Sequence, residues 1–102
     1  MRVVFLDIDG VLNCESDLFY GIMINKDSVG RVNLLCRNHK AKIVISSSWR
    51  NLYRLNDIRM MLKDHGMDNN IIIDQTPVLN GTRGQEIEKW IDNRGDIDGY
   101  VI

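Results

Sequence analysis

The sequence has few features that would mark it as anything other than a small globular protein. Its 102 residues include one proline and two cysteines, and 13 basic residues stand against 14 acidic ones, giving a net charge of −1. Because neither sign of charge predominates, the composition supports neither nucleic-acid binding through a basic surface nor intrinsic disorder. We expect one domain, residues 1–102, because two domains would not fit in this length.

Long apolar runs are also absent. No run approaches the roughly 20 residues that a membrane-spanning helix needs, and Met1 is not followed by a signal-peptide pattern. We therefore expect a cytoplasmic protein without membrane contact. In such a protein Cys14 and Cys36 are expected to be reduced thiols. A zinc site is not expected, because there is no close cysteine pair and His39 and His65 stand alone.

Short apolar, β-branched runs alternate with amphipathic segments along the chain. This alternation predicts a doubly wound, Rossmann-like parallel sheet between helices, a three-layer α/β/α architecture. The residues between the first strand and the first helix have no helical period and are expected to form a loop or small hairpin. The expected strands are 3–6, 43–45, 71–73 and 100–102, the expected helices follow Asp27, Asn56 and Thr82, and the loop is 8–27.

Local signals mark the ends of the helices. Asp27 and Asn56 are candidate N-caps, and Gly66 is a candidate terminator of the second helix. The segment 82–85, Thr-Arg-Gly-Gln, has the form of a capping box, and Gly95 is expected to end the last helix.

Ligands of doubly wound sheets bind beyond the carboxyl ends of the strands, where the strand order reverses. The residues that follow the strands are therefore the first candidates for a functional site. These residues are 7–10, 46–50 and 74–76.

The strongest signal is the pair Asp7 and Asp9, which leaves the first strand just ahead of Gly10. Two carboxylates in this arrangement can bind a hard cation, or can act as a nucleophile and an acid/base. The alternative is an ordinary strand exit made of turn-forming residues. A calcium loop is excluded, because Val11 and Leu12 stand where that loop needs a ligand residue and a glycine.

Two further groups suit an anion at the same edge of the sheet. The second strand ends in Ser46 and Ser47, with Arg50 nearby, and these hydroxyls and this guanidinium can hold a phosphate. Arg83 begins the last helix, where the helix dipole disfavours a cation, and this suggests an anion close by. The alternatives are a serine-rich loop or helix cap, and a solvated surface charge.

Taken together, these residues resemble the haloacid dehalogenase (HAD) superfamily of phosphohydrolases, over almost the whole chain. Asp7 and Asp9 match its first motif, an apolar strand followed by Asp-x-Asp-Gly-Val. Ser46 or Ser47 matches the second motif, a hydroxyl residue that closes the next strand. Arg83 looks like the third motif, a basic residue near the start of the helix before strand four, although lysine is more usual there.

Two longer segments, 46–50 and 83–91, look like a small branch of this superfamily that includes phage proteins and domains of RNA-repair enzymes. Comparison with this branch favours Ser47 over Ser46, because Trp49 then follows by two places, as in related sequences with Thr-Gly-Trp.

The resemblance implies a Mg²⁺-dependent phosphatase, a hydrolase in which Asp7 attacks phosphorus and forms an aspartyl-phosphate. Asp9 would protonate the leaving oxygen and then activate water. The Asp7 carboxylate and the Asp9 backbone carbonyl would hold Mg²⁺. Ser47, or else Ser46, would hydrogen-bond the phosphate, and Arg83 would offset the charge of the nucleophile and the transferring group.

One part of the family pattern is missing. Members of the superfamily carry acidic residues just after the fourth strand, whereas this chain stops at Ile102, inside or at the end of that strand. Asp96 and Asp98 precede the apolar run and are expected in a turn at the opposite end of the sheet. We therefore expect an incomplete metal site and a sheet without its last strand. A catalytically impaired phosphate-binding or interaction module stays open as the alternative function.

The loop lengths leave no room for a cap domain, so we expect an open site. Such a site suits a phosphate on a large substrate such as a nucleic-acid end, and Phe19 and Tyr20 can stack on a base or anchor their loop. Arg50 and Arg54 can reach a phosphate backbone, but two arginines do not form a basic stripe. A phosphotransferase or mutase is a third hypothesis. The exposed last strand suggests a homodimer through edge pairing.

Overall fold

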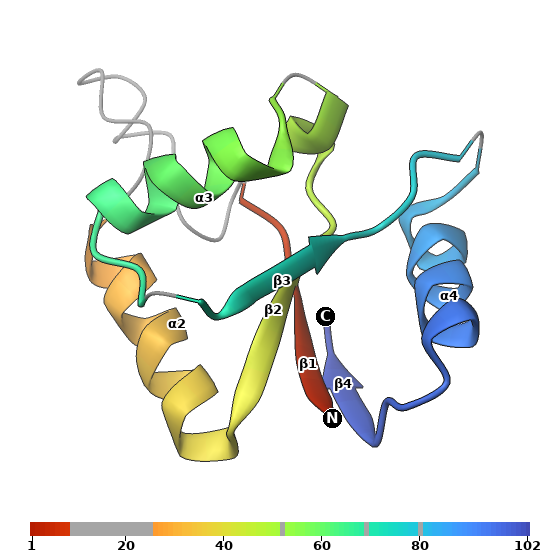
Figure 1. Ribbon diagram of the computed structural model, residues 1–102, viewed down its shortest axis with the longest axis horizontal. Helices are drawn as coiled ribbons and strands as arrows, with labels where there is room; N and C mark the ends of the chain where they lie inside the picture. Colours follow the sequence, from red (N-terminus) through yellow and green to blue (C-terminus); the bar gives the residue numbers. More distant parts are fainter. Residues whose placement is uncertain (9–25, 52, 69, 80) are drawn as a thin grey trace.

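The computed structural model describes residues 1–8, 26–51, 53–68, 70–79 and 81–102 (Figure 1). Most of the expected 8–27 loop, including Asp9, Cys14, Phe19 and Tyr20, lies outside the described residues. The elements are β1 (Arg2–Leu6), α2 (Lys26–His39), β2 (Ala41–Ile45), the 3₁₀ helix η1 (Ser48–Asn51), α3 (Leu55–Asp64), β3 (Ile72–Gln75), α4 (Arg83–Arg94) and β4 (Gly99–Val101).

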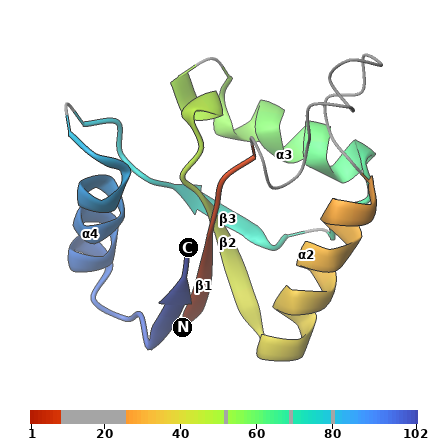
Figure 2. The same cartoon turned by 180° about the vertical axis from the view of Figure 1, so that it is seen from behind.

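The described strands form one parallel sheet in the order β3-β2-β1-β4. From β1 the chain adds β2 and β3 on one side and then returns to place β4 on the other, so the strand order reverses at β1. Helices α2 and α3 cover one face and α4 covers the other, as Figure 1 shows from the edge and Figure 2 from behind. This arrangement confirms the predicted doubly wound, Rossmann-like α/β fold.

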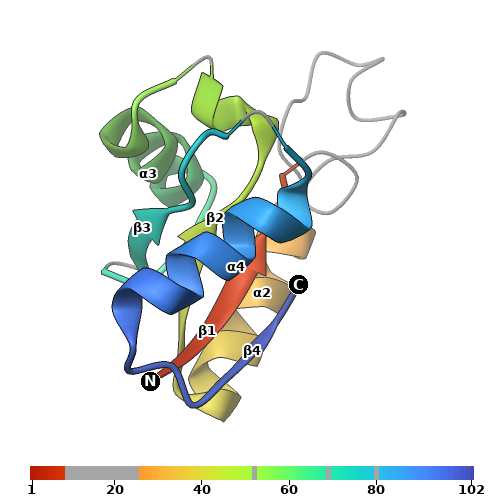
Figure 3. The same ribbon diagram turned by 90° about the vertical axis from the view of Figure 1, so that its right-hand side faces the viewer.

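Two apolar cores, one on each face, hold the layers together. Val4 and Leu6 of β1 belong to the larger core with residues of α2 and α3, while Val3 and Phe5 belong to the smaller core with α4. The ring of Phe5 meets that of Trp90 edge-on, with centroids 5.6 Å apart, under α4, which faces the viewer in Figure 3. Because β1 is buried on both faces, its run of apolar residues is continuous rather than alternating.

The last helix begins and ends as its sequence predicts. The Thr82 side chain accepts a hydrogen bond from the Gln85 backbone N–H, and the Gln85 side chain accepts one from the Thr82 N–H, which completes the capping box. Gly95 closes the helix with a φ of 77°, a left-handed conformation that favours glycine. The predicted N-cap of α3, Asn56, was wrong by two residues, because the helix begins at Leu55 with Arg54 as its N-cap and Asn56 lies inside it.

The third strand lies further along the chain than predicted. It begins at Ile72 and ends at Gln75, and an irregularity in its pairing with β2 sets Asp74 opposite Val44. Asp74 therefore belongs to the strand, and its carboxylate accepts hydrogen bonds from the indole N–H of Trp90 (2.8 Å) and the backbone N–H of Gln75 (2.8 Å). Asp74 stabilises the packing of α4 on the sheet.

Asp96 and Asp98 lie before β4, at the edge of the sheet opposite the strand carboxyl ends, as predicted. The backbone N–H of Asp98 donates to the carbonyl of Met1 (2.8 Å), and Arg94 forms an exposed ion pair with Asp96 (3.0 Å). Both carboxylates therefore belong to the connection between α4 and β4, at the opposite end of the sheet from Asp7.

Cys36 is a buried free thiol, and burial is the main cause that raises its pKa. None of the described helices combines the length and apolar character of a membrane span.

Candidate functional site

Asp7 lies where the strand order reverses. It directly follows β1, the strand between β2 and β4, and its side chain is half-buried. Because Leu6 pairs with Ile45, the residues that follow these two strands, Asp7 and Ser46, emerge side by side at the same edge of the sheet. This is the edge at which doubly wound proteins bind ligands.

Ser46 extends the contact between β1 and β2 beyond the ends of both strands. Its backbone N–H donates to the carbonyl of Leu6 (3.0 Å), and its hydroxyl donates to the same oxygen (3.3 Å). Both Ser46 and Ser47 are buried. The main chain next to Asp7 is thereby held against the end of β2.

Arg83 extends from the first residue of α4 back to these strand ends. Its Nε and Nη2 atoms donate to the hydroxyl oxygen of Ser46 at 3.0 and 2.7 Å, and Nη2 also donates to the carbonyl of Phe5 at 3.3 Å. The positive group therefore lies beside the strand that leads to Asp7. Three of the predicted site residues, Asp7, Ser46 and Arg83, thus come from separate segments to one edge of the sheet.

The hydroxyl of Ser46 is fully used in contacts with the protein. A hydroxyl can donate one hydrogen bond and accept two, and that of Ser46 donates to Leu6 and accepts twice from Arg83. The protein itself therefore supplies all three hydrogen bonds that this hydroxyl can form. Ser46 is therefore occupied as a support for Arg83, and the sequence preference for Ser47 as the direct phosphate contact stays a prediction.

A second pair of polar side chains, not expected from the sequence, is buried near Ser46 and Arg83. The guanidinium of Arg50 lies 2.9 Å from the carboxylate of Glu86, and the two side chains are 5% and 7% exposed. Arg50 is thus enclosed within the protein, so the expectation that it can reach a phosphate backbone was wrong. A signal was available for Glu86, which precedes Trp90 by one helical turn and so shares the buried face of α4.

The surroundings keep Glu86 ionised. Burial by itself raises the pKa of this carboxyl group, but the hydrogen bonds from Arg50 and from the Leu79 backbone N–H, together with the charge of Arg50, outweigh burial and lower it. The pair is therefore a carboxylate and a guanidinium.

Of the predicted metal ligands, the structure describes Asp7 and not Asp9. Among the residues described, no three or more His, Cys, Asp or Glu side chains gather as a metal cluster would require. The carboxylate of Asp7 is the kind of oxygen ligand that Mg²⁺ prefers.

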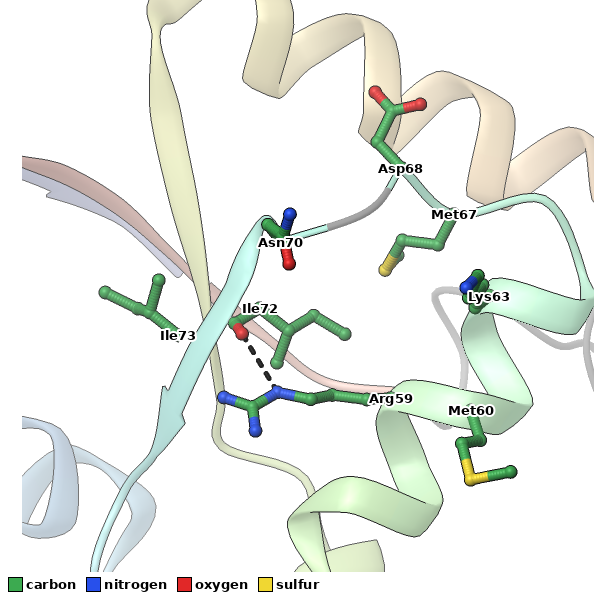
Figure 4. A pocket seen from close by; sticks show the side chains of 8 residues that line it. All are labelled: Arg59, Met60, Lys63, Met67, Asp68, Asn70, Ile72 and Ile73. Atoms are coloured by element: carbon green, nitrogen blue, oxygen red, sulfur yellow. Dashed lines mark hydrogen bonds between the residues drawn. The ribbon is translucent and has the colours of Figure 1, made fainter.

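A cavity of about 540 Å³ lies elsewhere, between α3 and the beginning of β3 (Figure 4). Arg59 and Lys63 line it from the helix, and Arg59 donates a hydrogen bond to the backbone carbonyl of Ile72 (3.0 Å). The arginine thus covers a polar group of the edge strand β3. This cavity is not lined by any of the predicted site residues.

Comparison with known proteins identifies one matching family. The sequence model of one protein family, described as the HAD domain in Swiss Army Knife RNA repair proteins, matches residues 3–102. No curated protein and no solved structure matches the chain.

Proposed function

The chain belongs to this family of HAD domains, and we propose on that basis that it is a Mg²⁺-dependent phosphatase acting through an aspartyl-phosphate. Membership of the family supports a phosphohydrolase-type function. The observation that carries the finer proposal is the position of Asp7 at the end of the central strand, beside the hydrogen-bonded pair Ser46 and Arg83.

In the proposed reaction the carboxylate of Asp7 attacks the phosphorus of a phosphomonoester. The bond from phosphorus to the leaving oxygen breaks, and that oxygen takes a proton from Asp9. Asp9 then removes a proton from a water molecule, whose oxygen attacks the phosphorus of the aspartyl-phosphate. Inorganic phosphate leaves and the carboxylate of Asp7 is restored.

Two groups would stabilise the charge that develops on the phosphoryl oxygens. The guanidinium of Arg83 is held beside β1 by Ser46 and Phe5, so it needs little reorganisation to act. Ser47 would donate its hydroxyl hydrogen to a phosphoryl oxygen. Ser46 serves this site by holding Arg83.

The residues that would hold Mg²⁺ are Asp7, through its carboxylate, and Asp9, through its backbone carbonyl. The carboxylate of Asp7 fits this cation in ligand type. When bound, Mg²⁺ would neutralise charge on a phosphoryl oxygen and so help the negatively charged nucleophile to approach.

The proposed substrate is a phosphate on a large molecule, with a nucleic-acid end as the first candidate. Support comes from the family description, which refers to RNA repair proteins. The seven residues between β3 and α4 are too few for a cap domain at that point. The net charge of −1 adds no support for nucleic acid.

The proposed function is tested by hydrolysis of an aryl phosphate with and without Mg²⁺. We expect Mg²⁺-dependent turnover that Asp7→Asn abolishes. Asp92→Asn, on the exposed face of α4, is the matched control and should leave turnover unchanged. No turnover in the wild-type protein, together with binding of beryllofluoride, would instead support the phosphate-binding module. Transfer to an acceptor alcohol in preference to water would support a phosphotransferase.

We also propose that the protein forms a homodimer through β4. This strand is at an edge of the described sheet, and Tyr100, Val101 and Ile102 are 51%, 54% and 67% exposed. An uncovered edge with apolar side chains favours pairing with a second copy. Sedimentation should show a dimer that Val101→Lys dissociates, and a monomeric wild-type protein would contradict the proposal.

A further inference from the structure

Three segments meet at the end of the sheet where the strands have their carboxyl ends, and Arg50 contacts all of them. Its Nε donates to the carbonyl of Ser47 (2.8 Å), and its Nη1 donates to the carbonyls of Thr76 (3.0 Å) and Pro77 (2.9 Å). Its Nη2 donates to Glu86 in the first turns of α4 (2.9 Å). One side chain thus joins the residues after β2, the residues after β3 and the beginning of α4.

Glu86 extends this connection. Its second carboxylate oxygen accepts a hydrogen bond from the backbone N–H of Leu79 (2.8 Å). The segment between β3 and α4 is therefore held by both members of the pair, Arg50 and Glu86. Glu86 also lies three residues after Arg83, one turn along the same helix face. Whatever holds Glu86 in place therefore also limits where the backbone of Arg83 can lie.

We propose that Arg50 and Glu86 form a positioning pair that sets Arg83 and Ser47 relative to each other for phosphate binding. The inference rests on the proposed function of these two residues. Arg50 holds the main chain of Ser47 through two hydrogen bonds, from its Nε (2.8 Å) and its backbone N–H (3.1 Å). Through Glu86 the same guanidinium holds the helix that carries Arg83.

Stability alone is a weak reason for a pair buried to this degree. The desolvation of two charges offsets most of their attraction, and apolar residues of similar size often replace such pairs without loss of stability. What apolar residues cannot replace is the directional set of hydrogen bonds to Ser47, Thr76 and Pro77. The pair therefore fixes the relative positions of these segments at the end of the sheet where Asp7 lies.

The test uses two single variants and one double variant of the whole chain. Glu86→Gln keeps a hydrogen-bond acceptor and removes the charge, whereas Arg50→Lys keeps the charge and removes the planar donor set. The double variant Arg50→Met/Glu86→Met fills the same space with apolar side chains. We expect it to unfold cooperatively, with a midpoint of denaturant unfolding near that of the wild type. Asp68→Asn is the matched control, because its ion pair with Arg37 is exposed and involves none of the site residues.

The first readout is hydrogen exchange of the Arg83 Nε–H group, followed by ¹⁵N NMR without substrate. Because this proton is bonded to Ser46, we expect slow exchange in the wild type and in Asp68→Asn. We expect exchange at least about tenfold faster in the two single variants and in the double variant. Unchanged exchange in all three would overturn the proposal, whether or not the wild-type protein is a phosphatase.

The second readout is kcat/KM for the aryl phosphate. We expect a fall of roughly 10- to 100-fold in the three variants, because a misplacement of about 1 Å can cost on the order of 100-fold in rate. Wild-type kcat/KM in the well-folded double variant would also overturn the proposal. Absence of turnover in the wild type would contradict the proposed function, and the exchange measurement would still decide whether the pair positions Arg83.

Discussion

Arg83 donates two hydrogen bonds to the hydroxyl of Ser46, although the two residues lie 37 positions apart in the chain. The contact connects the beginning of α4 to the end of β2, next to the strand that leads to Asp7. The helix dipole disfavours a cation at the beginning of α4. The contact with Ser46 nevertheless holds the Arg83 guanidinium in place near the carboxyl ends of the strands.

The first prediction concerns the charge of Arg83. Arg83→Ala is expected to lower kcat/KM for an aryl phosphate by roughly 100- to 1000-fold, the range seen when a donor to a developing oxyanion is removed. Arg83→Lys should recover part of this loss, because lysine restores the charge but not the paired donation to Ser46. Equal values of kcat/KM for the wild type and Arg83→Ala would show that Arg83 does not take part in the reaction.

The second prediction separates the two serines. Ser46→Ala removes the acceptor of Arg83, so its effect on kcat/KM should disappear when Arg83 is already alanine. Ser47→Ala should instead lower kcat/KM in both backgrounds, because Ser47 would contact the phosphate itself. A double-mutant cycle with steady-state kinetics measures this difference, and additive effects for Ser46 and Arg83 would contradict it.

The third prediction is a pH dependence of stability that originates at Glu86. The pKa of its carboxyl group is lowered from the ordinary value of 4.5, with Arg50 as its partner. A group with a lowered pKa stabilises the folded state above its unfolded pKa, and this contribution is lost as pH falls through the folded pKa. The free energy of unfolding of the wild type relative to Glu86→Gln should therefore be constant at neutral pH and should shrink below about pH 4.5.

Denaturant titrations of the two proteins across this acid range provide the measurement. Asp68→Asn, which removes a partly exposed carboxylate whose pKa is also lowered, shows how much of the acid dependence comes from another ion pair. A wild-type advantage over Glu86→Gln that stayed constant to the lowest pH would show that Glu86 has an unshifted pKa.

The fourth prediction uses two glycines in opposite conformations. Gly30 lies inside α2 with nothing within 4 Å of an added Cβ, so Gly30→Ala should stabilise the protein by about 0.5–1 kcal/mol. Gly95 closes α4 with a φ of 77°, so Gly95→Ala should destabilise it by about 1–2 kcal/mol. Thermal unfolding of both variants measures the two effects, and a shift of the same sign for both would contradict this prediction.

Much of the fold follows from local patterns. The apolar run at 3–6 indicates a strand buried on both faces, and the Thr82 capping box indicates where α4 begins, because each depends on neighbouring residues alone. The position of Asp7 beyond the central strand follows from the alternation of strands and helices together with the rules of chain connection.

Contacts between distant segments could not be predicted in this way. The shift of β3, which places Asp74 in the strand, depends on its pairing with β2. Arg50 lies close in sequence to the serines and was expected to face a phosphate, but it is buried against Glu86. The partner of a long charged side chain depends on which segments pack around it, and this is known only when the layers are assembled.

The sequence by itself determined the element types, the doubly wound architecture and the candidate residues Asp7, Asp9, Ser46, Ser47 and Arg83, because periodicity, caps and motifs are local properties. Only the tertiary structure decided that Ser46 holds Arg83 and that Arg50 joins three segments, because hydrogen bonds of this kind depend on distances between residues far apart in the chain.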